Sequence, residues 1–209
     1  MNDLDLASLV VSRVCHDLIS PVGAIVNGLE VIADDDDPEL RTQALALIAR
    51  SAAQASAKLQ FARLAYGASG SRGDILPIGD VREVARLLFA DSKVSLDWKA
   101  EEIELPKAFV RALANLVMLG QECLPRGGVV TVLAENSPNG VQLVVKAQGQ
   151  GARLAEDQRA ALMGETTLET VESRAMCGFV LGLLLRGFGE TAKVESNPDL
   201  VTFRISHIR

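Results

Sequence analysis

Apolar residues in the first third of the chain recur at alternating steps of four and three positions, which predicts two long helices. The first stretch covers residues 4–32 and the second covers residues 44–66. The predicted seams are Val11, Cys15, Leu18, Val22, Ile25, Leu29 and Ile32 on the first helix, and Leu45, Ile48, Ala52, Ala55, Leu59, Ala62 and Tyr66 on the second.

A short polar turn joins these helices into an antiparallel hairpin, predicted over residues 1–70. The turn holds four aspartates and a proline, in which Asp37 can cap the second helix and Pro38 suits its first position. The glycine-rich string GASGSRG, residues 67–73, ends that helix. A lone hairpin leaves half of each seam uncovered, so we expect two copies to pair as a four-helix bundle. The alternative is that both seams pack on the rest of the same chain.

After residue 73 helices and strands are mixed, which predicts a second domain over residues 74–209. Helices packed on one face of a mixed or antiparallel sheet form an α+β sandwich. The predicted fold class is therefore an α-helical hairpin followed by an α+β sandwich. The expected helices cover 78–90, 107–124 and 178–188, and the expected strands cover 93–99, 129–134, 141–147, 192–196 and 201–206, with a turn at Gly140.

Composition and charge narrow the classes of function. The chain is 48% apolar and 23% charged, which is typical of a globular protein. Its net charge of −6 argues against broad nucleic-acid binding, which needs a concentrated basic face. No apolar run approaches the ~18–20 residues of a membrane helix, and no secretory signal is apparent, so we expect a cytoplasmic protein without membrane contact. The three cysteines, Cys15, Cys123 and Cys177, fit no disulfide or zinc pattern and are interpreted as buried thiols.

One of the two histidines, His16, lies at the edge of the first seam. Small and polar residues, including Ser20 and Asn27, share its face at helical spacing, so we expect the imidazole to be exposed. An exposed imidazole is largely neutral at pH 7 and offers the nitrogen lone pair that a phosphoryl acceptor requires. Asp17 can hold the ring through its other nitrogen, and Arg13 lies alongside. The alternative is a solvated surface histidine without a function.

The string CHDLISP, residues 15–21, resembles the H-box of two-component histidine kinases. In that motif a histidine is followed by an acidic residue, a leucine and, after two further positions, a proline. The H-box of those kinases begins the first helix of a dimerising hairpin, which implies the same role here. Pro21 would cost ~3 kcal/mol in an ordinary helix interior, so a seam that continues past it suggests a tolerated kink.

The order of elements after residue 73 resembles the ATP-binding domain of histidine kinases, the GHKL or Bergerat fold. The strings at 115–128 and 187–196 resemble its N-box helix and its closing turn and strand. Its metal-binding asparagine, however, falls on Leu119, its nearby lysine on Glu122 and its adenine-reading aspartate on Ala147. Leucine cannot coordinate a hard cation, and alanine cannot accept the adenine amino proton, so we expect neither ATP binding nor self-phosphorylation. The lid is reduced to residues 175–179, and the remaining glycines are interpreted as turn residues.

An intact H-box fused to a nucleotide site without its key groups resembles the ChpT-type histidine phosphotransferases. This resemblance implies a homodimer in which His16 relays a phosphoryl group from the receiver domain of a hybrid histidine kinase to response regulators in a cell-cycle relay. It implies that this chain binds no cofactor or metal and that the partner receiver domain supplies Mg²⁺. The expected site residues are His16 as acceptor, Asp17 as its assistant, and Arg13, Ser20, Asn27 and Arg153 as partner contacts.

Two other functions stay open at this point. The first is an ATP-dependent histidine kinase with an unusual pocket, which nucleotide titration would reveal. The second is a non-enzymatic dimeric adaptor with an incidental histidine, which would take no phosphate at His16.

Overall fold

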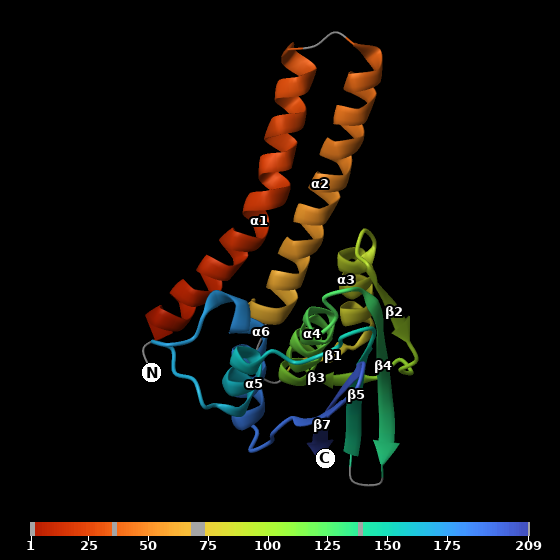
Figure 1. Cartoon of the computed structure of the whole chain (residues 1–209). Coiled ribbons are helices and arrows are strands. Elements are labelled where there is room, and N and C mark those ends of the chain that lie inside the picture. The colour runs from red at the N-terminus through yellow and green to blue at the C-terminus, as the bar shows by residue number, and fades with distance from the viewer. Residues whose placement is uncertain (1–2, 35–36, 68–73, 138–139, 209) are drawn as a thin grey trace.

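A helical hairpin stands on an α+β sandwich in the computed structural model, which describes residues 3–34, 37–67, 74–137 and 140–208 (Figure 1). Helix α1 spans Asp3–Asp34 and helix α2 spans Pro38–Tyr66. The cap of α2 forms as predicted, because the backbone N–H of Glu39 donates to Asp37 Oδ1 at 2.8 Å and Pro38 opens the helix.

The single seam predicted for α1 in fact divides between two faces. One face packs on α2: Gly28 approaches it so closely that an added Cβ would lie 2.7 Å from Cγ1 of Ile48. Leu18 and Ile25 share this face and are half-buried. Most of the rest of the predicted seam faces solvent, with exposures of 59% for Val11, 48% for Val22 and 54% for Leu29, whereas Ile32 is half-buried. The hairpin therefore presents a second apolar face that none of the described residues covers.

Helix α1 continues through Pro21, which is buried, and it leans away from α2 toward its N-terminal end (Figure 1). By length and hydropathy alone it could span a membrane, because it has 31 residues from Leu4 to Asp34 and an 18-residue window within it has a mean hydropathy of 1.5. It is the one such helix in the part of the chain that the structure describes. The sequence analysis expected no uninterrupted apolar run of membrane length, and polar residues do interrupt this helix; core helices and signal sequences meet the same two criteria.

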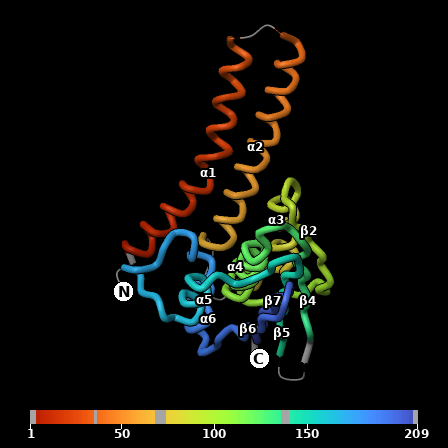
Figure 2. The backbone as a smooth tube through the Cα atoms, in the orientation of Figure 1, coloured from red at the N-terminus to blue at the C-terminus, as the bar shows by residue number. Residues whose placement is uncertain are grey.

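The second domain is a five-stranded sheet with helices on one face (Figures 1 and 2). The strand order is β2–β4–β5–β7–β6, in which β2 and β4 run parallel and the other neighbours run antiparallel. The predicted α+β sandwich is confirmed. Its elements are β1 Ile75–Pro77, α3 Gly79–Phe89, β2 Val94–Trp98, β3 Glu104–Pro106, α4 Lys107–Glu122, β4 Gly128–Ser137, β5 Gly140–Gln148, α5 Glu156–Met163, α6 Met176–Arg186, β6 Lys193–Asn197 and β7 Leu200–Ile208.

Three short elements and one helix were not predicted from the sequence. Strands β1 and β3 have three residues each and pair with one another, and η1, at Ser173–Ala175, is a single 3₁₀ turn. Helix α5 has only eight residues, and its four polar residues all precede its four apolar ones, so it lacks the apolar period that identifies the longer helices.

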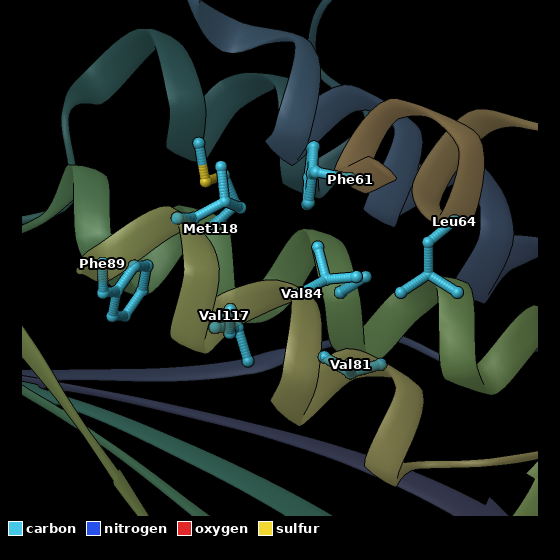
Figure 3. Close-up of a pocket in the computed structure, with 10 residues that line it drawn as sticks. Phe61, Leu64, Val81, Val84, Phe89, Val117 and Met118 are labelled. Atoms are coloured by element: carbon cyan, nitrogen blue, oxygen red, sulfur yellow. The ribbon is translucent and has the colours of Figure 1, made fainter. Parts of the chain in front are cut away.

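Both helices of the hairpin dock on the second domain, α1 through its N-terminal part and α2 through its C-terminal part. The end of α2 contributes Phe61 and Ala65 to the main core, and Leu6 and Leu9 of α1 pack on a smaller cluster around Phe179. Figure 3 shows the α2 junction, where Phe61 and Leu64 face side chains of α3 and α4 across a cavity with room for about one water molecule. The alternative that the hairpin packs on its own chain therefore holds for the N-terminal part of α1 and the C-terminal part of α2. The part of the hairpin nearer its turn extends away from the second domain (Figure 1).

Candidate functional site

His16 lies midway along α1, and its side chain is 78% exposed. Ser20 and Asn27 are also exposed, and at 100° per residue they fall within about 40° of His16 around the helix. His16 lies about 120° round from Val22, so it points away from the uncovered apolar face. The structure therefore brings three of the predicted site residues together on one accessible side of the hairpin.

Asp17 lies between the histidine ring and the second domain. Its Oδ1 is 3.5 Å from Nδ1 of His16, and its Oδ2 accepts a hydrogen bond of 2.9 Å from Nε of Arg13. Lys58 of α2 donates from Nζ to the backbone oxygen of Asp17 at 2.7 Å. A carboxylate beside Nδ1 favours the tautomer with hydrogen on that nitrogen, which leaves the lone pair on Nε2 free and exposed.

Arg13 does not lie on the docking face where the sequence analysis placed it. Its side chain is 12% exposed, and it donates to Glu122 Oε1 at 2.8 Å and to the backbone oxygen of Ser173 at 3.1 Å. Burial works to lower the pKa of Arg13, but the groups around it, Glu122 and Asp17 among them, outweigh burial and raise it. The role of Arg13 as a partner contact is therefore corrected: its charge is used inside this chain.

Glu122 anchors this arrangement from the end of α4. Its Oε2 accepts a hydrogen bond from Nε2 of Gln158, and its Oε1 accepts the one from Arg13. Burial raises the pKa of Glu122, and the charge of Arg13 opposes that rise. The phenol of Tyr66 lies 3.6 Å from the Cys177 sulfur below this group, and burial raises the pKa of the Cys177 thiol to about 12. The second domain thus reaches α1 through a buried polar cluster.

The positions aligned with a nucleotide site hold packing and turn residues. Leu119 and Ala147 are both 0% exposed and belong to the main core. Gly151 has a φ of +74°, and its N–H donates to Asp199 Oδ1 at 2.7 Å, as expected of a turn residue. Gly178 lets α6 approach α5, because an added Cβ would lie 2.7 Å from the backbone oxygen of Gln158. In the described residues, no group of three or more His, Cys, Asp or Glu side chains is arranged to hold a metal ion.

The remaining candidates have mixed outcomes. Arg153 is exposed on the loop before α5, so it is accessible to a partner. Cys123 and Cys177 are buried as predicted, but Cys15 is exposed because it lies on the uncovered side of α1. The sequence analysis missed Lys58 and Gln158 as neighbours of the site. Their partners lie 41 and 36 residues away along the chain, a separation that no local motif reveals.

Comparisons with known proteins agree with this geometry. The family model described as the histidine phosphotransferase C-terminal domain matches residues 78–199. The protein phosphotransferase ChpT of Brucella abortus (strain 2308) is 35% identical over 203 residues, which cover 97% of this chain and 96% of that protein. The chain belongs to the histidine phosphotransferase family.

A solved structure of a bacterial phosphotransferase shares this fold over almost its whole length. It is 33% identical, covers 98% of this chain and 97% of its own, and has a TM-score of 0.87. The histidine kinase AdeS of Acinetobacter baumannii is a more distant structural match, at 15% identity and a TM-score of 0.48. This histidine phosphotransferase thus combines an exposed histidine on a helical hairpin with an α+β second domain.

Proposed function

We propose that His16 is the phosphoacceptor of a relay between two receiver domains. The lone pair of Nε2 attacks the phosphorus of an aspartyl phosphate on a docked receiver, an N–P bond forms, and the P–O bond to the receiver aspartate breaks. The aspartate leaves as a carboxylate, and the imidazole ring gains a formal positive charge while Nδ1 keeps its proton. The reverse steps pass the phosphoryl group to the second receiver.

One observation carries this proposal: His16 is 78% exposed, and its Nδ1 faces the Asp17 carboxylate. The exposure lets a folded partner reach Nε2 in line with the breaking bond. The carboxylate stabilises the positive charge that develops on the ring. Phosphoryl transfer depends mainly on positioning and charge neutralisation, and the receiver contributes acidic residues and Mg²⁺ for the latter, so this chain needs no metal or cofactor of its own.

The partners in this proposal are receiver domains of a hybrid kinase and of response regulators, as in a cell-cycle relay in the cytoplasm. Both receivers must reach the same nitrogen, so they use one surface in turn. Ser20 and Asn27 lie on that surface next to His16, and Arg153 extends it from the second domain.

The proposal includes a homodimer formed through the uncovered apolar face of the hairpin. On α1 the exposed residues lie on average about 70° round from Leu18, Ile25 and Gly28, and on α2 they lie on average about 60° round from Ala44 and Ile48 in the same rotational sense. Because the helices are antiparallel, these offsets place both sets on the same side of the hairpin. A second copy that pairs there would form a four-helix bundle and leave His16 outside it. The face consists of Val11, Val22, Val26 and Leu29 on α1 and Leu45 and Leu59 on α2, each between 48% and 59% exposed.

An ATP-dependent kinase is the less favoured function. The side chain of Leu119 offers no oxygen for a cation, and that of Ala147 offers no acceptor for adenine. Both side chains are buried in the core. Glu122 stands where the kinases have a lysine near the nucleotide, and its negative charge is paired with Arg13. A non-enzymatic adaptor would not require the carboxylate contact at Nδ1 of the histidine.

The test is incubation of the full chain with a phosphorylated receiver domain, followed by detection of acid-labile, base-stable phosphate. We expect label on the wild-type protein and none on His16→Ala, which should keep its helicity because the residue is exposed. A parallel reaction with Mg-ATP alone should give no label. Wild-type protein that takes no phosphate from any phosphorylated receiver would refute the relay, and label from ATP alone would restore the kinase.

A further inference from the structure

Three consecutive polar contacts connect the second domain to the ring of His16. Glu122 Oε1 lies 2.8 Å from Nη2 of Arg13, and Nε of Arg13 lies 2.9 Å from Oδ2 of Asp17. The other oxygen of Asp17 lies 3.5 Å from Nδ1 of His16. The chain of contacts starts in the interior and ends at the surface, with side-chain exposures of 20% for Glu122, 12% for Arg13, 28% for Asp17 and 78% for His16.

Arg13 can place a carboxylate accurately because every part of its guanidinium is held. Nε binds Asp17, Nη2 binds Glu122, and Nη1 donates to the backbone oxygens of Ser173 at 3.1 Å and Arg174 at 3.4 Å. An exposed Arg–Asp pair four residues apart on a helix contributes little to stability and leaves both side chains mobile. Here the planar fork is fixed by groups of the second domain, so Asp17 has a fixed partner.

The Glu122 carboxylate is itself held in place, so that its Oε1 is the oxygen that binds Arg13. Gln158 of α5 donates to its second oxygen, which prevents the carboxylate from rotating freely. The second domain of this chain therefore contacts the helix that carries His16 through a fixed carboxylate. Its Glu122 holds Arg13, and Arg13 in turn orients the Asp17 carboxylate beside the His16 ring.

We propose that Glu122 is a positioning residue for phosphoryl transfer, which acts through Arg13 and Asp17 to hold His16 in the tautomer with hydrogen on Nδ1. This inference rests on the proposed function of His16 as phosphoacceptor. Without Glu122, Arg13 loses one of its two anionic partners and Asp17 loses its fixed orientation. The ring then populates the other tautomer, whose lone pair points toward Asp17 rather than toward the receiver.

The first measurement is the tautomer of His16, read from ¹⁵N and ¹H chemical shifts in the full-length protein. The chain has only two histidines, so His16→Ala assigns the signals of His16 by their loss. We expect a larger fraction of the tautomer with hydrogen on Nε2 in Glu122→Gln and in Arg13→Lys, because a lysine cannot bind two carboxylates as a planar fork does.

The matched control is Glu102→Gln. Glu102 is also an acidic residue of the second domain that accepts a hydrogen bond, from the backbone N–H of Gly79 at 2.8 Å, and its ion pair is with Arg82 rather than with Arg13. It should leave the His16 tautomer unchanged. A shift of equal size in this control would overturn the inference.

The second measurement is a double-mutant cycle on the transfer rate. We expect Glu122→Gln to slow transfer roughly tenfold, the low end of what loss of an orienting partner costs, and to have no further effect in an Asp17→Asn background. Equal slowing in both backgrounds, or an unchanged tautomer in Glu122→Gln, would show that Glu122 only stabilises the fold. If the wild-type protein accepts no phosphate at all, the proposed function fails, and the tautomer comparison still decides the role of Glu122.

Discussion

Val22→Glu should convert the proposed dimer into a folded monomer. Val22 is 48% exposed on the uncovered face of α1, so pairing would hide about half of a valine side chain. That burial is worth ~1 kcal/mol for each chain. A glutamate loses this contribution, and it also places a carboxylate without a partner in an apolar interface at a cost of roughly 2 kcal/mol or more.

Symmetry doubles the effect, because the substitution occurs in both chains. A loss of ~3 kcal/mol per chain gives ~6 kcal/mol in total, which raises the dissociation constant of the dimer by a factor of about 10⁴. The site is half-exposed in the single chain, so the helix itself should tolerate the change. Leu18→Glu would be a poorer test, since Leu18 lies on the face that packs on α2 and a charge there would disrupt the hairpin.

The assay is sedimentation velocity at micromolar protein, with circular dichroism to check helicity. Gln43→Glu is the control, because it adds the same charge at an exposed position about 160° round α2 from Leu45. We expect dimers for the wild type and for Gln43→Glu, and monomers for Val22→Glu. A Val22→Glu protein that sediments as the wild type does would show that the copies do not pair through this face.

Three further predictions follow from the described surfaces. Ser20→Arg should slow phosphoryl transfer in both directions at unchanged helicity, and Glu39→Arg at the far end of the hairpin should not; equal transfer rates in a time course would place the receiver elsewhere. Alkylation of the monomeric Val22→Glu protein at pH 8 should add one label, at exposed Cys15, since Cys123 and Cys177 are buried and burial raises the pKa of each thiol to about 12; intact-mass analysis that shows three labels would contradict this burial. Millimolar Mg-ATP should leave the melting temperature unchanged, whereas a ligand at ~100 times its dissociation constant would add about 2.7 kcal/mol of stability.

Local pattern predicted most of this fold. The long helices and the strands around Val130 and Val144 follow from the spacing of apolar residues, and the Asp37 cap follows from residue type alone. The seam on α1 was harder, because residues that face α2 and residues that face solvent are both apolar and alternate within one period. Only the position of the second helix separates Ile25 from Val22.

The site was predicted to the extent that it is local. The H-box string located His16, Asp17 and their exposed neighbours on one helix. It could not show what Arg13 binds, because Glu122 lies 109 residues away along the chain. Glu122 stands where the histidine kinases have a lysine, and the sequence alone indicated only that a nucleotide contact is missing there. The structure shows what it gained, an ion pair with the helix that carries the histidine.

The place of β7 in the sheet has a consequence for how the protein folds. This strand is the last element in chain order, yet it lies between β5 and β6 and pairs with both. The hairpin depends on nearby contacts and can form as soon as α2 is synthesised, whereas the sheet must wait for its final strand. The contact between Arg13 and Glu122 joins the early unit to the late one. A newly made chain should therefore expose His16 on a formed helix before Asp17 is held in place, and competence for phosphoryl transfer should appear last during biosynthesis.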